Sequence, residues 1–343
     1  MLPEGLARAL LPWYEKNARD LPWRRDVTPY RVWISEIMLQ QTRIEAARGY
    51  FQRFMTALPD VAALAAAEED QVLKLWEGLG YYSRARNLHK AARQIMEQYG
   101  GELPADYSQL RALPGIGDYT AGAVASIAFG LPEPAVDGNV LRICARLSRC
   151  PDSIGDGRVK NAFREELRRQ YPAGHCGAFT SALMELGETV CLPGTPDCGR
   201  CPLAGLCQAR AAGRQTDYPI MPEKKPRRIQ QRTVFLLTWG DTVALQKRPD
   251  RGLLAGLWEF PNVEGALSPE EALQKAAAWG CEPTSAEPCG EAVHIFSHIE
   301  WHMTGYRVPC GAAPERFLWA DPVQRREKFA VPAAFRAYKN ILD

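Results

Sequence analysis

Four cysteines beyond the middle of the chain have the number and spacing of a metal centre. Cys191, Cys198, Cys201 and Cys207 follow the pattern Cys-x6-Cys-x2-Cys-x5-Cys, with prolines and glycines between them. Four thiolates in so short a segment can converge on an iron–sulfur centre, and zinc accepts the same ligands. Disulfides are the less favoured alternative, since the ten cysteines of the whole chain are too sparse for a disulfide-rich secreted scaffold. The spacing predicts a metal centre and leaves the metal open.

A second segment, LPGIGDYTAG at 113–122, has the residues of a tight turn between two helices. Gly115 and Gly117 would leave backbone N–H groups exposed, and such groups can hold a phosphate oxygen without a charged side chain. An ordinary corner between two helices fits these residues equally well. The segment alone therefore leaves both interpretations open.

Two carboxylates have surroundings that would separate their pKa values. Glu36 lies among apolar residues such as Trp33 and Ile37, which should raise its pKa and keep it protonated. Asp137 directly precedes a helix expected to start near Gly138, where N–H dipoles favour the ionised form. Such a pair can supply an acid and an anion. Taken alone, the two residues also fit a half-exposed helix position and an ordinary helix cap.

The composition indicates two soluble globular domains. The chain has 343 residues, of which 46% are hydrophobic and 24% charged, which excludes a mainly disordered protein. Residues 1–217 carry 26 Lys+Arg against 25 Asp+Glu, and residues 218–343 carry 16 against 15, so bulk charge does not indicate a nucleic-acid binder. No run reaches the length of a membrane helix, and the N-terminus lacks the features of a signal peptide. We expect a cytoplasmic protein.

Periodicity predicts a helical first part and a mixed second part. Apolar spacing and caps predict helices at 28–38, 61–67, 85–96, 140–149 and 158–170. Further on, Gly240-Asp241 predicts a hairpin turn, 294–308 is rich in strand formers, and 268–279 and 332–342 are helical.

Residues 213–231 are proline-rich, poor in apolar residues and predicted to be a linker. Their basic cluster, Lys224, Lys225, Arg227 and Arg228, is interpreted as a solvated tether, with contact to DNA phosphates as the alternative. We therefore predict domains at 1–212 and 232–343.

The hairpin segment and the cysteines together resemble the helix-hairpin-helix DNA glycosylase superfamily over most of residues 8–210. The resemblance is closest to its adenine DNA glycosylase (MutY) branch. It rests on LPWR at 21–24, TPYRVWISEIMLQQT at 28–42, GLGYYSRARNLH at 78–89 and VDGNVLRICAR at 136–146. It implies an all-α helix-hairpin-helix core with an iron–sulfur loop, a [4Fe–4S] cluster on the four cysteines, and an α+β Nudix-like (MutT-like) C-terminal domain.

The resemblance also implies roles for the residues of the active site. Glu36 would protonate adenine and Asp137 would stabilise an oxocarbenium-like sugar, directly or through a transient covalent bond. In the related endonuclease III branch, the hairpin carries a lysine that forms a Schiff base, and such chemistry needs an amine. Tyr119 stands at that position here, which excludes this lyase mechanism and implies a monofunctional glycosylase. Tyr119 is expected to contact the extrahelical nucleotide.

Further residues are implied to contact DNA. The implied partner is double-stranded DNA in which adenine is mispaired with 8-oxoguanine or guanine, bound by a monomer, and the base must first leave the stack. The residues expected at the mispair or at the pocket wall are Trp23, Arg24, Gln41, Thr42 and Tyr81. Asn139, two residues after Asp137, is expected with the catalytic residues as a polar support in the pocket.

The second domain resembles the Nudix fold through PDRGLLAGLWEFPN at 249–262. A Nudix hydrolase needs an Arg-Glu-x-x-Glu-Glu helix to hold magnesium, whereas SPEEALQKAAAWG has Lys275 and alanines there. Hydrolysis of nucleotides by this domain is therefore not expected, and recognition of a base remains as its expected role. Phe296, Ser297 and His298 match the family's segment that recognises 8-oxoguanine.

Three alternatives remain open: an endonuclease III-type lyase, a DNA-binding iron–sulfur protein without catalysis, and a nucleotide-pool hydrolase. The tyrosine at 119 opposes the first, the presence of both Glu36 and Asp137 opposes the second, and the missing carboxylates oppose the third.

Overall fold

The computed structural model describes residues 1–223 and 226–342, so Lys224 and Lys225 of the predicted basic cluster lie outside it. The chain forms two compact units. The helical unit consists of Met1–Ala66 and Asn87–Glu223, and the sheet unit of Ala67–Arg86 and residues 226–342. In the described part of the chain, no helix has the length and apolar character needed to cross a membrane.

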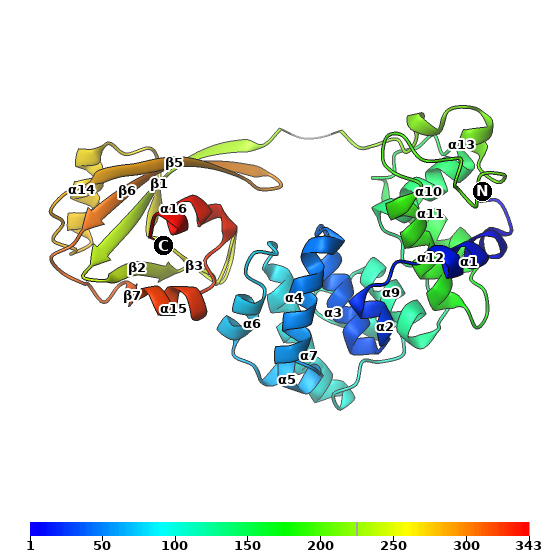
Figure 1. Ribbon diagram of the computed structural model, residues 1–343, viewed down its shortest axis with the longest axis horizontal. Helices are drawn as coiled ribbons and strands as arrows, with labels where there is room; N and C mark the ends of the chain where they lie inside the picture. The colour runs from blue at the N-terminus through cyan, green and yellow to red at the C-terminus, as the bar shows by residue number, and fades with distance from the viewer. Residues whose placement is uncertain (224–225, 343) are drawn as a thin grey trace. The chain divides into compact units, whose positions relative to one another are not determined.

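The helical unit is built almost entirely from short helices (Figure 1). Its helices are α1 (Leu6–Asn17), α2 (Pro22–Arg25), α3 (Pro29–Leu39), α4 (Ile44–Ala57), α5 (Val61–Ala66), the greater part of α7 (Ser83–Tyr99), α8 (Tyr107–Ala112), α9 (Asp118–Phe129), α10 (Gly138–Ser148), α11 (Gly157–Arg168), α12 (Cys176–Thr189), α13 (Gln208–Ala211) and the 3-10 turn η1 (Gln215–Asp217). The expected helices are confirmed. Thr28 caps α3 by accepting a hydrogen bond from the N–H of Arg31, and Pro29 occupies its first turn.

Helix α12 is the central element of this unit, since it packs against α1, α9 and α10. Phe179 and Leu186 on α12, Leu6 on α1 and Val140 on α10 are completely buried in one apolar cluster. Burial of apolar side chains is the main stabilising contribution to such packing. The cluster fixes the amino end of α10 beside α12, and both elements contribute to the site described below.

The sheet unit is a mixed sheet with helices on both faces. Its strands are β1 (Arg228–Trp239), β2 (Thr242–Lys247), β3 (Trp258–Glu259), β4 (Asn262–Glu264), β5 (Glu287–Ile295), β6 (Ile299–Pro309) and β7 (Leu318–Ala320). The strand order is β3-β2-β1-β6-β5, with β4 paired to β1 and β7 paired to β2. Only the β1–β6 pair of these described strands is parallel.

Alternate residues of β1 point into two separate cores, as the period of a strand requires. Val234 and Leu236 pack with Phe335 and Tyr338 on one face. The opposite face carries Phe235 and Leu237, which pack with helix α14 (Pro269–Ala278). The remaining helical elements are α6 (Glu69–Leu75), α15 (Pro322–Glu327), η2 (Ala333–Phe335) and α16 (Arg336–Leu342). The expected hairpin is confirmed, with Trp239 paired to Thr242 across Gly240-Asp241.

The division into domains at 1–212, 213–231 and 232–343 remains a prediction from composition, and two features of the structure differ from it. Strand β1 begins at Arg228, inside the expected linker, because its backbone pairs with β6 from Ile299 onward. Residues Ala67–Arg86 belong to the sheet unit rather than to the helical unit. Neither feature has a signal in composition, since backbone pairing and tertiary contact produce both.

Candidate active site

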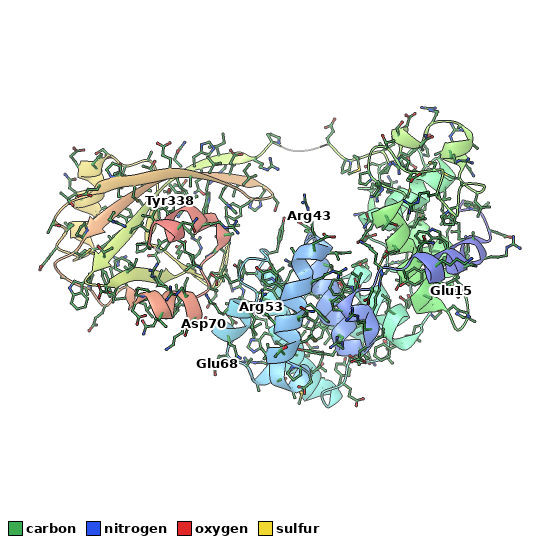
Figure 2. The ribbon with its side chains drawn as sticks, viewed as in Figure 1. Glu15, Arg43, Arg53, Glu68, Asp70 and Tyr338 are labelled. Carbon is green, nitrogen blue, oxygen red and sulfur yellow. The ribbon has the colours of Figure 1, made fainter. Side chains whose placement is uncertain are left out.

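A cleft of about 1030 Å³ opens on the helical unit. Its walls come from α2 and α3, from the amino ends of α9 and α10, and from α12. The cleft brings together ten of the residues that the sequence singles out: Trp23, Arg24, Glu36, Gln41, Thr42, Gly115, Gly117, Tyr119, Asp137 and Asn139. Arg43, at the start of α4, also lines it (Figure 2).

Glu36 lies on α3 and only 6% of its surface is exposed. Its carboxyl oxygen Oε2 accepts a hydrogen bond from the hydroxyl of Tyr119, with 2.6 Å between the oxygens. Burial and, to a smaller extent, the negative charge of Asp137 raise the pKa of Glu36 to about 7, against the lowering effect of the Tyr119 hydrogen bond. Glu36 is therefore protonated to a large extent near neutral pH, which is the property of a general acid.

Asp137 is the N-cap of α10, as the sequence predicts. Its Oδ1 accepts from the N–H of Val140 at 2.8 Å, and its Oδ2 accepts from the side-chain amide of Asn139 at 3.0 Å. Burial nevertheless raises the pKa of Asp137 above its usual value, because the hydrogen bonds from the backbone of Val140 and of Asn139 lower it by less. The expectation from the helix dipole alone was therefore incomplete. The donors still favour the anion here, and Glu36 has no such backbone donor.

The pKa of Tyr119 is affected by both carboxyl groups. Burial, followed by the charges of Glu36 and Asp137, raises the pKa of Tyr119 well above its usual value. The phenol is therefore neutral and acts as a hydrogen-bond donor. A neutral phenol cannot form the Schiff base of a lyase, which requires an amine.

Ion pairs hold the wall of the cleft at α2 against α12. Arg24 pairs with the fully buried Glu185 of α12 at 2.8 Å, and Arg19 pairs with both Glu185 and Glu188. Burial acts to raise the pKa of Glu185, but the hydrogen bond from Arg19 and the two arginine charges bring it below its usual range. Trp23 packs edge-on against Phe51, with ring centroids 5.6 Å apart. These contacts fix the segment 19–24 against α12.

Sequence reasoning missed the contribution of α12 to the cleft. Ser181, Met184 and Glu188 line it, and the negative charge of Glu188 acts to raise the pKa values of Glu36 and Asp137. None of these residues stands in a recognisable motif. Only the packing of α12 against α9 and α10 brings them to the site, so no local signal could have found them.

The hairpin joins α8 to α9, and its two glycines differ. Gly115 has a φ of +76°, and a Cβ there would lie 2.6 Å from the Cβ of Asn87. Gly117 is the extended N-cap of α9, and a Cβ there would meet nothing within 4 Å. Only Gly115 is required by the fold. The amino end of α9 opens toward the cleft, where helix N–H groups suit an anion.

The four spaced cysteines lie in the loop from α12 to α13. Burial, together with the smaller effects of the charges of Cys191, Cys207 and Cys198, raises the pKa of Cys201 to about 11. Within residues 1–223 and 226–342, no three metal-ligating side chains are placed to hold a single ion. In a tetrahedral zinc site all sulfurs lie about 2.3 Å from one ion. In a four-iron cluster the thiolates are distributed over separate irons.

Two arginines connect this loop to α10. Arg146 donates to the Sγ of Cys191 at 3.3 Å and to the carbonyl of Leu192 at 2.8 Å. Arg142 donates to the carbonyl of Cys191 at 2.8 Å and to the Oδ1 of Asn139 at 2.9 Å. The loop is therefore connected to Asp137 through hydrogen bonds of Arg142 and Asn139.

In the sheet unit, Phe296, Ser297 and His298 form the turn between β5 and β6. The N–H of Phe296 donates to the carbonyl of Ile299 at 2.8 Å, and we call Phe296–Ile299 the recognition turn. The ring of Phe296 packs edge-on against Trp301 at 4.9 Å. Ser297 and His298 are exposed, whereas Phe296 is partly buried. The turn thus presents the hydroxyl and the imidazole, and Phe296 anchors it.

Tyr81 also belongs to the sheet unit. It has a φ of +46°, and 48% of its surface is exposed. The Nζ of Lys275, on α14, lies 5.7 Å from the ring centroid of Trp279. Lys275 is basic and cannot serve as a carboxylate ligand of magnesium. The sheet unit therefore exposes Ser297, His298 and Tyr81, and their role in recognition stays a prediction.

Two family models match the chain. Residues 34–169 match the HhH-GPD superfamily of base excision DNA repair proteins, and residues 233–340 match the NUDIX domain. The first match covers both members of the carboxylate pair, and the second covers most of the sheet unit. The expected fold class, a helix-hairpin-helix core with a Nudix-like C-terminal domain, is confirmed.

Proteins named adenine DNA glycosylase are similar to most of the chain. The one from Mus musculus is 34% identical over 96% of this chain and 77% of its own length. The one from Buchnera aphidicola subsp. Acyrthosiphon pisum is 34% identical over 87% of this chain and 84% of its own length.

Among solved structures, a thermostable thymine-DNA glycosylase covers 60% of the chain and 95% of its own, with 28% identity and a TM-score of 0.53. An endonuclease III in a non-covalent DNA complex covers 61% of the chain and 94% of its own, with 25% identity and a TM-score of 0.51.

Proposed function

The chain belongs to the adenine DNA glycosylase family, and on this premise we propose that it excises adenine from DNA where adenine is paired with 8-oxoguanine or guanine. The observation that carries the proposal is the pair formed by Glu36, with a pKa near 7, and Asp137, held by two N–H donors, in one cleft. Such a pair suits the cleavage of an N-glycosidic bond. The purine departs as a neutral base when it is protonated, and the sugar becomes cationic.

In this mechanism the protonated Glu36 donates to the ring nitrogen of the flipped adenine. General acid catalysis of this kind contributes roughly 10²–10⁴ in rate. Tyr119 holds the carboxyl group of Glu36 through its hydroxyl, and Asp137 stabilises the positive charge on the deoxyribose. Asn139 orients Asp137, and Trp23 and Arg24 form the wall beside the base. Water then completes the hydrolysis, since the site provides no amine at position 119.

The recognition of the opposite base is assigned to the sheet unit and to the rim of the cleft. Ser297 can donate or accept a hydrogen bond at a base edge, with His298 beside it. Tyr81 supplies an exposed aromatic ring for stacking. Gln41, with its φ of +57°, and Thr42 line the cleft where the gap left by the flipped base must be filled. The hairpin at Gly115 and Gly117 contacts a phosphate.

The four cysteines are proposed to hold a [4Fe–4S] cluster, which would be a structural centre for the loop between α12 and α13. The set of four free cysteines in one loop and the hydrogen bond from Arg146 to Cys191 support this assignment. Hydrogen bonds to the sulfurs are among the features that tune such clusters.

The proposed activity is tested by incubating the full chain with duplexes that differ only in the base opposite adenine. Release of free adenine, detected by chromatography, is expected with 8-oxoguanine and with guanine opposite, and not with thymine. The DNA strand should remain intact until it is treated with alkali, since no lyase step occurs. Strand cleavage without alkali, or no release of adenine from either mispair, would refute the proposal.

A further inference from the structure

The segment Ala67–Arg86 comes from the N-terminal half of the chain but packs as part of the sheet unit. It contains α6 and the loop with Tyr81. Asp70, which is labelled in Figure 2, lies at the start of α6 and pairs with Lys247 of β2 at 3.0 Å. The two places that we propose to contact the mispair, Tyr81 and the recognition turn, therefore belong to the same compact unit.

Glu77 is the centre of the polar contacts between this segment and the C-terminal elements. Its Oε1 accepts from the Nζ of Lys339 on α16 at 3.1 Å and from the N–H of Val331 at 3.2 Å. Its Oε2 pairs with Lys74 at 2.5 Å, and the Nζ of Lys74 also donates to the carbonyl of Phe329 at 3.1 Å. The side chain of Glu77 is only 18% exposed, so water weakens these contacts less than it does on an open surface.

The loop that follows Glu77 is rigidly held. The guanidinium of Arg84, which is buried, donates to the carbonyls of Leu79 and Gly80 at 3.0 Å each and to that of Tyr81 at 3.4 Å. Trp76 donates through Nε1 to the carbonyl of Gly80 at 3.1 Å. The backbone from Trp76 to Arg84 is therefore fixed, and a displacement of Glu77 would move Tyr81 with it.

We propose that Glu77 is a positioning residue, which joins the Tyr81 loop to the C-terminal elements so that Tyr81 and the recognition turn engage the mispair as one body. The inference rests on the proposed function, in which both places contact DNA. Favourable contact of the turn with 8-oxoguanine then also stabilises the stacked position of Tyr81. Without the contacts of Glu77, Tyr81 and the recognition turn bind DNA separately, and the preference for 8-oxoguanine over guanine falls.

Charge reversal tests this role in the full, cluster-containing chain. Glu77→Lys and Lys339→Glu each replace an attraction with a repulsion, and the double variant restores an opposite-charge pair. Lys275→Glu on α14 is the control matched to Lys339→Glu, because it makes the same charge change in the same unit away from these contacts. The measurements are the ratio of single-turnover adenine excision rates with 8-oxoguanine and with guanine opposite, and the deuterium uptake of residues 67–86 without DNA.

We expect each single reversal to lower the ratio about fivefold, the effect of one partly buried ion pair. Uptake by 67–86 should rise in both single variants. The double variant should recover part of both changes, because it restores the pair with position 339 but leaves Lys74 and the N–H of Val331 without their acceptor. Lys275→Glu should change neither. Unchanged uptake and ratio in the single variants, or loss without recovery in the double variant, would overturn the role of Glu77.

Failure of the proposed function would be separate and visible. Ser297→Ala should lower the same ratio through the recognition turn alone, without a change in uptake by 67–86. If the parent shows no preference for 8-oxoguanine, or Ser297→Ala leaves it unchanged, the assignment of recognition is wrong. The uptake measurement still decides whether Glu77 holds the segment.

Discussion

Glu36 and Asp137 carry the same functional group in unlike surroundings. Glu36 is enclosed by apolar side chains of α3 and receives one hydrogen bond, from a phenol, whereas Asp137 receives two N–H donors at the start of α10. Burial acts on both and raises both pKa values, and for Glu36 the result is about 7. Two carboxyls with different surroundings can take the roles of acid and anion in one reaction.

Replacement of the phenol tests the control of the Glu36 proton. The hydroxyl of Tyr119 lowers the pKa of Glu36, so Tyr119→Phe should raise that pKa. Since the reaction needs the protonated acid, the excision rate should stay high to a higher pH in the variant. Tyr107→Phe is the control, because it removes a similar bond to Asp118 outside the carboxylate pair. A descending limb that moves to lower pH would contradict this account.

The same group predicts a pH-dependent stability. The pKa of Glu36 is raised from 4.5 to about 7 on folding. The buried carboxyl group therefore does not lower the free energy of unfolding at a pH below 4.5, and it lowers it by the full amount at a pH above about 7. Glu36→Gln should therefore unfold at the same temperature as the parent at pH 4.5 and at a higher temperature at pH 8. The difference at pH 8 corresponds to about 3 kcal/mol at most. Equal unfolding temperatures at both pH values would show that burial does not strain Glu36.

Sequence alone could identify part of this site. Glu36 and Asp137 stand in long motifs with a clear apolar or capping context, so their positions in the cleft agree with expectation. Glu188, and the Glu185 that holds Arg24, are isolated acidic residues of α12, and only tertiary packing brings them to the cleft. The pKa direction of Asp137 was likewise hidden, because it depends on how deeply the helix end is buried.

At the scale of elements, the hairpin between α8 and α9 depends on one glycine rather than two. Gly115→Ala places a Cβ 2.6 Å from that of Asn87 and forces a φ of +76° on alanine. The strained φ costs about 1–2 kcal/mol before the clash is counted. Gly117→Ala enters open space with extended backbone. Thermal denaturation should show a loss for the first variant and little change for the second; equal losses would refute the distinction.

Local signals predicted most elements well. Thr28-Pro29 starts α3, and Gly240, at a φ of +55°, forms the expected hairpin turn. The start of β1 at Arg228 was not predicted, because a basic and polar segment becomes a strand only through pairing with β6. Backbone pairing of this kind does not depend on hydrophobic periodicity, so composition gave the appearance of a linker.

At the scale of the whole molecule, the residues proposed for the chemistry and those proposed for recognition belong to different units. The carboxylate pair lies in the helical unit, while the recognition turn and Tyr81 lie in the sheet unit. The match of residues 78–89 to a glycosylase motif placed Tyr81 with the catalytic domain. Its packing with the C-terminal elements had no sequence signal, since Glu77, Lys74 and Lys339 are ordinary charged residues until the fold brings them together.

The nature of the metal centre can be read directly from the purified protein. A cluster gives a brown colour and visible absorbance, whereas zinc is colourless. Cys198→Ser should lower the iron content and the absorbance, and Cys150→Ser, outside the four-cysteine loop, should leave both unchanged. A colourless parent that contains zinc would refute the cluster assignment.

The most direct test of the account is the single-turnover release of adenine by Glu36→Gln from a duplex with 8-oxoguanine opposite adenine. Glutamine keeps the shape of the side chain but cannot provide the acidic proton. The account predicts that duplex affinity stays close to that of the parent, while release falls at least a hundredfold, as loss of a general acid requires. Release at the parental rate would contradict the central claim that a buried, protonated Glu36 drives departure of the base.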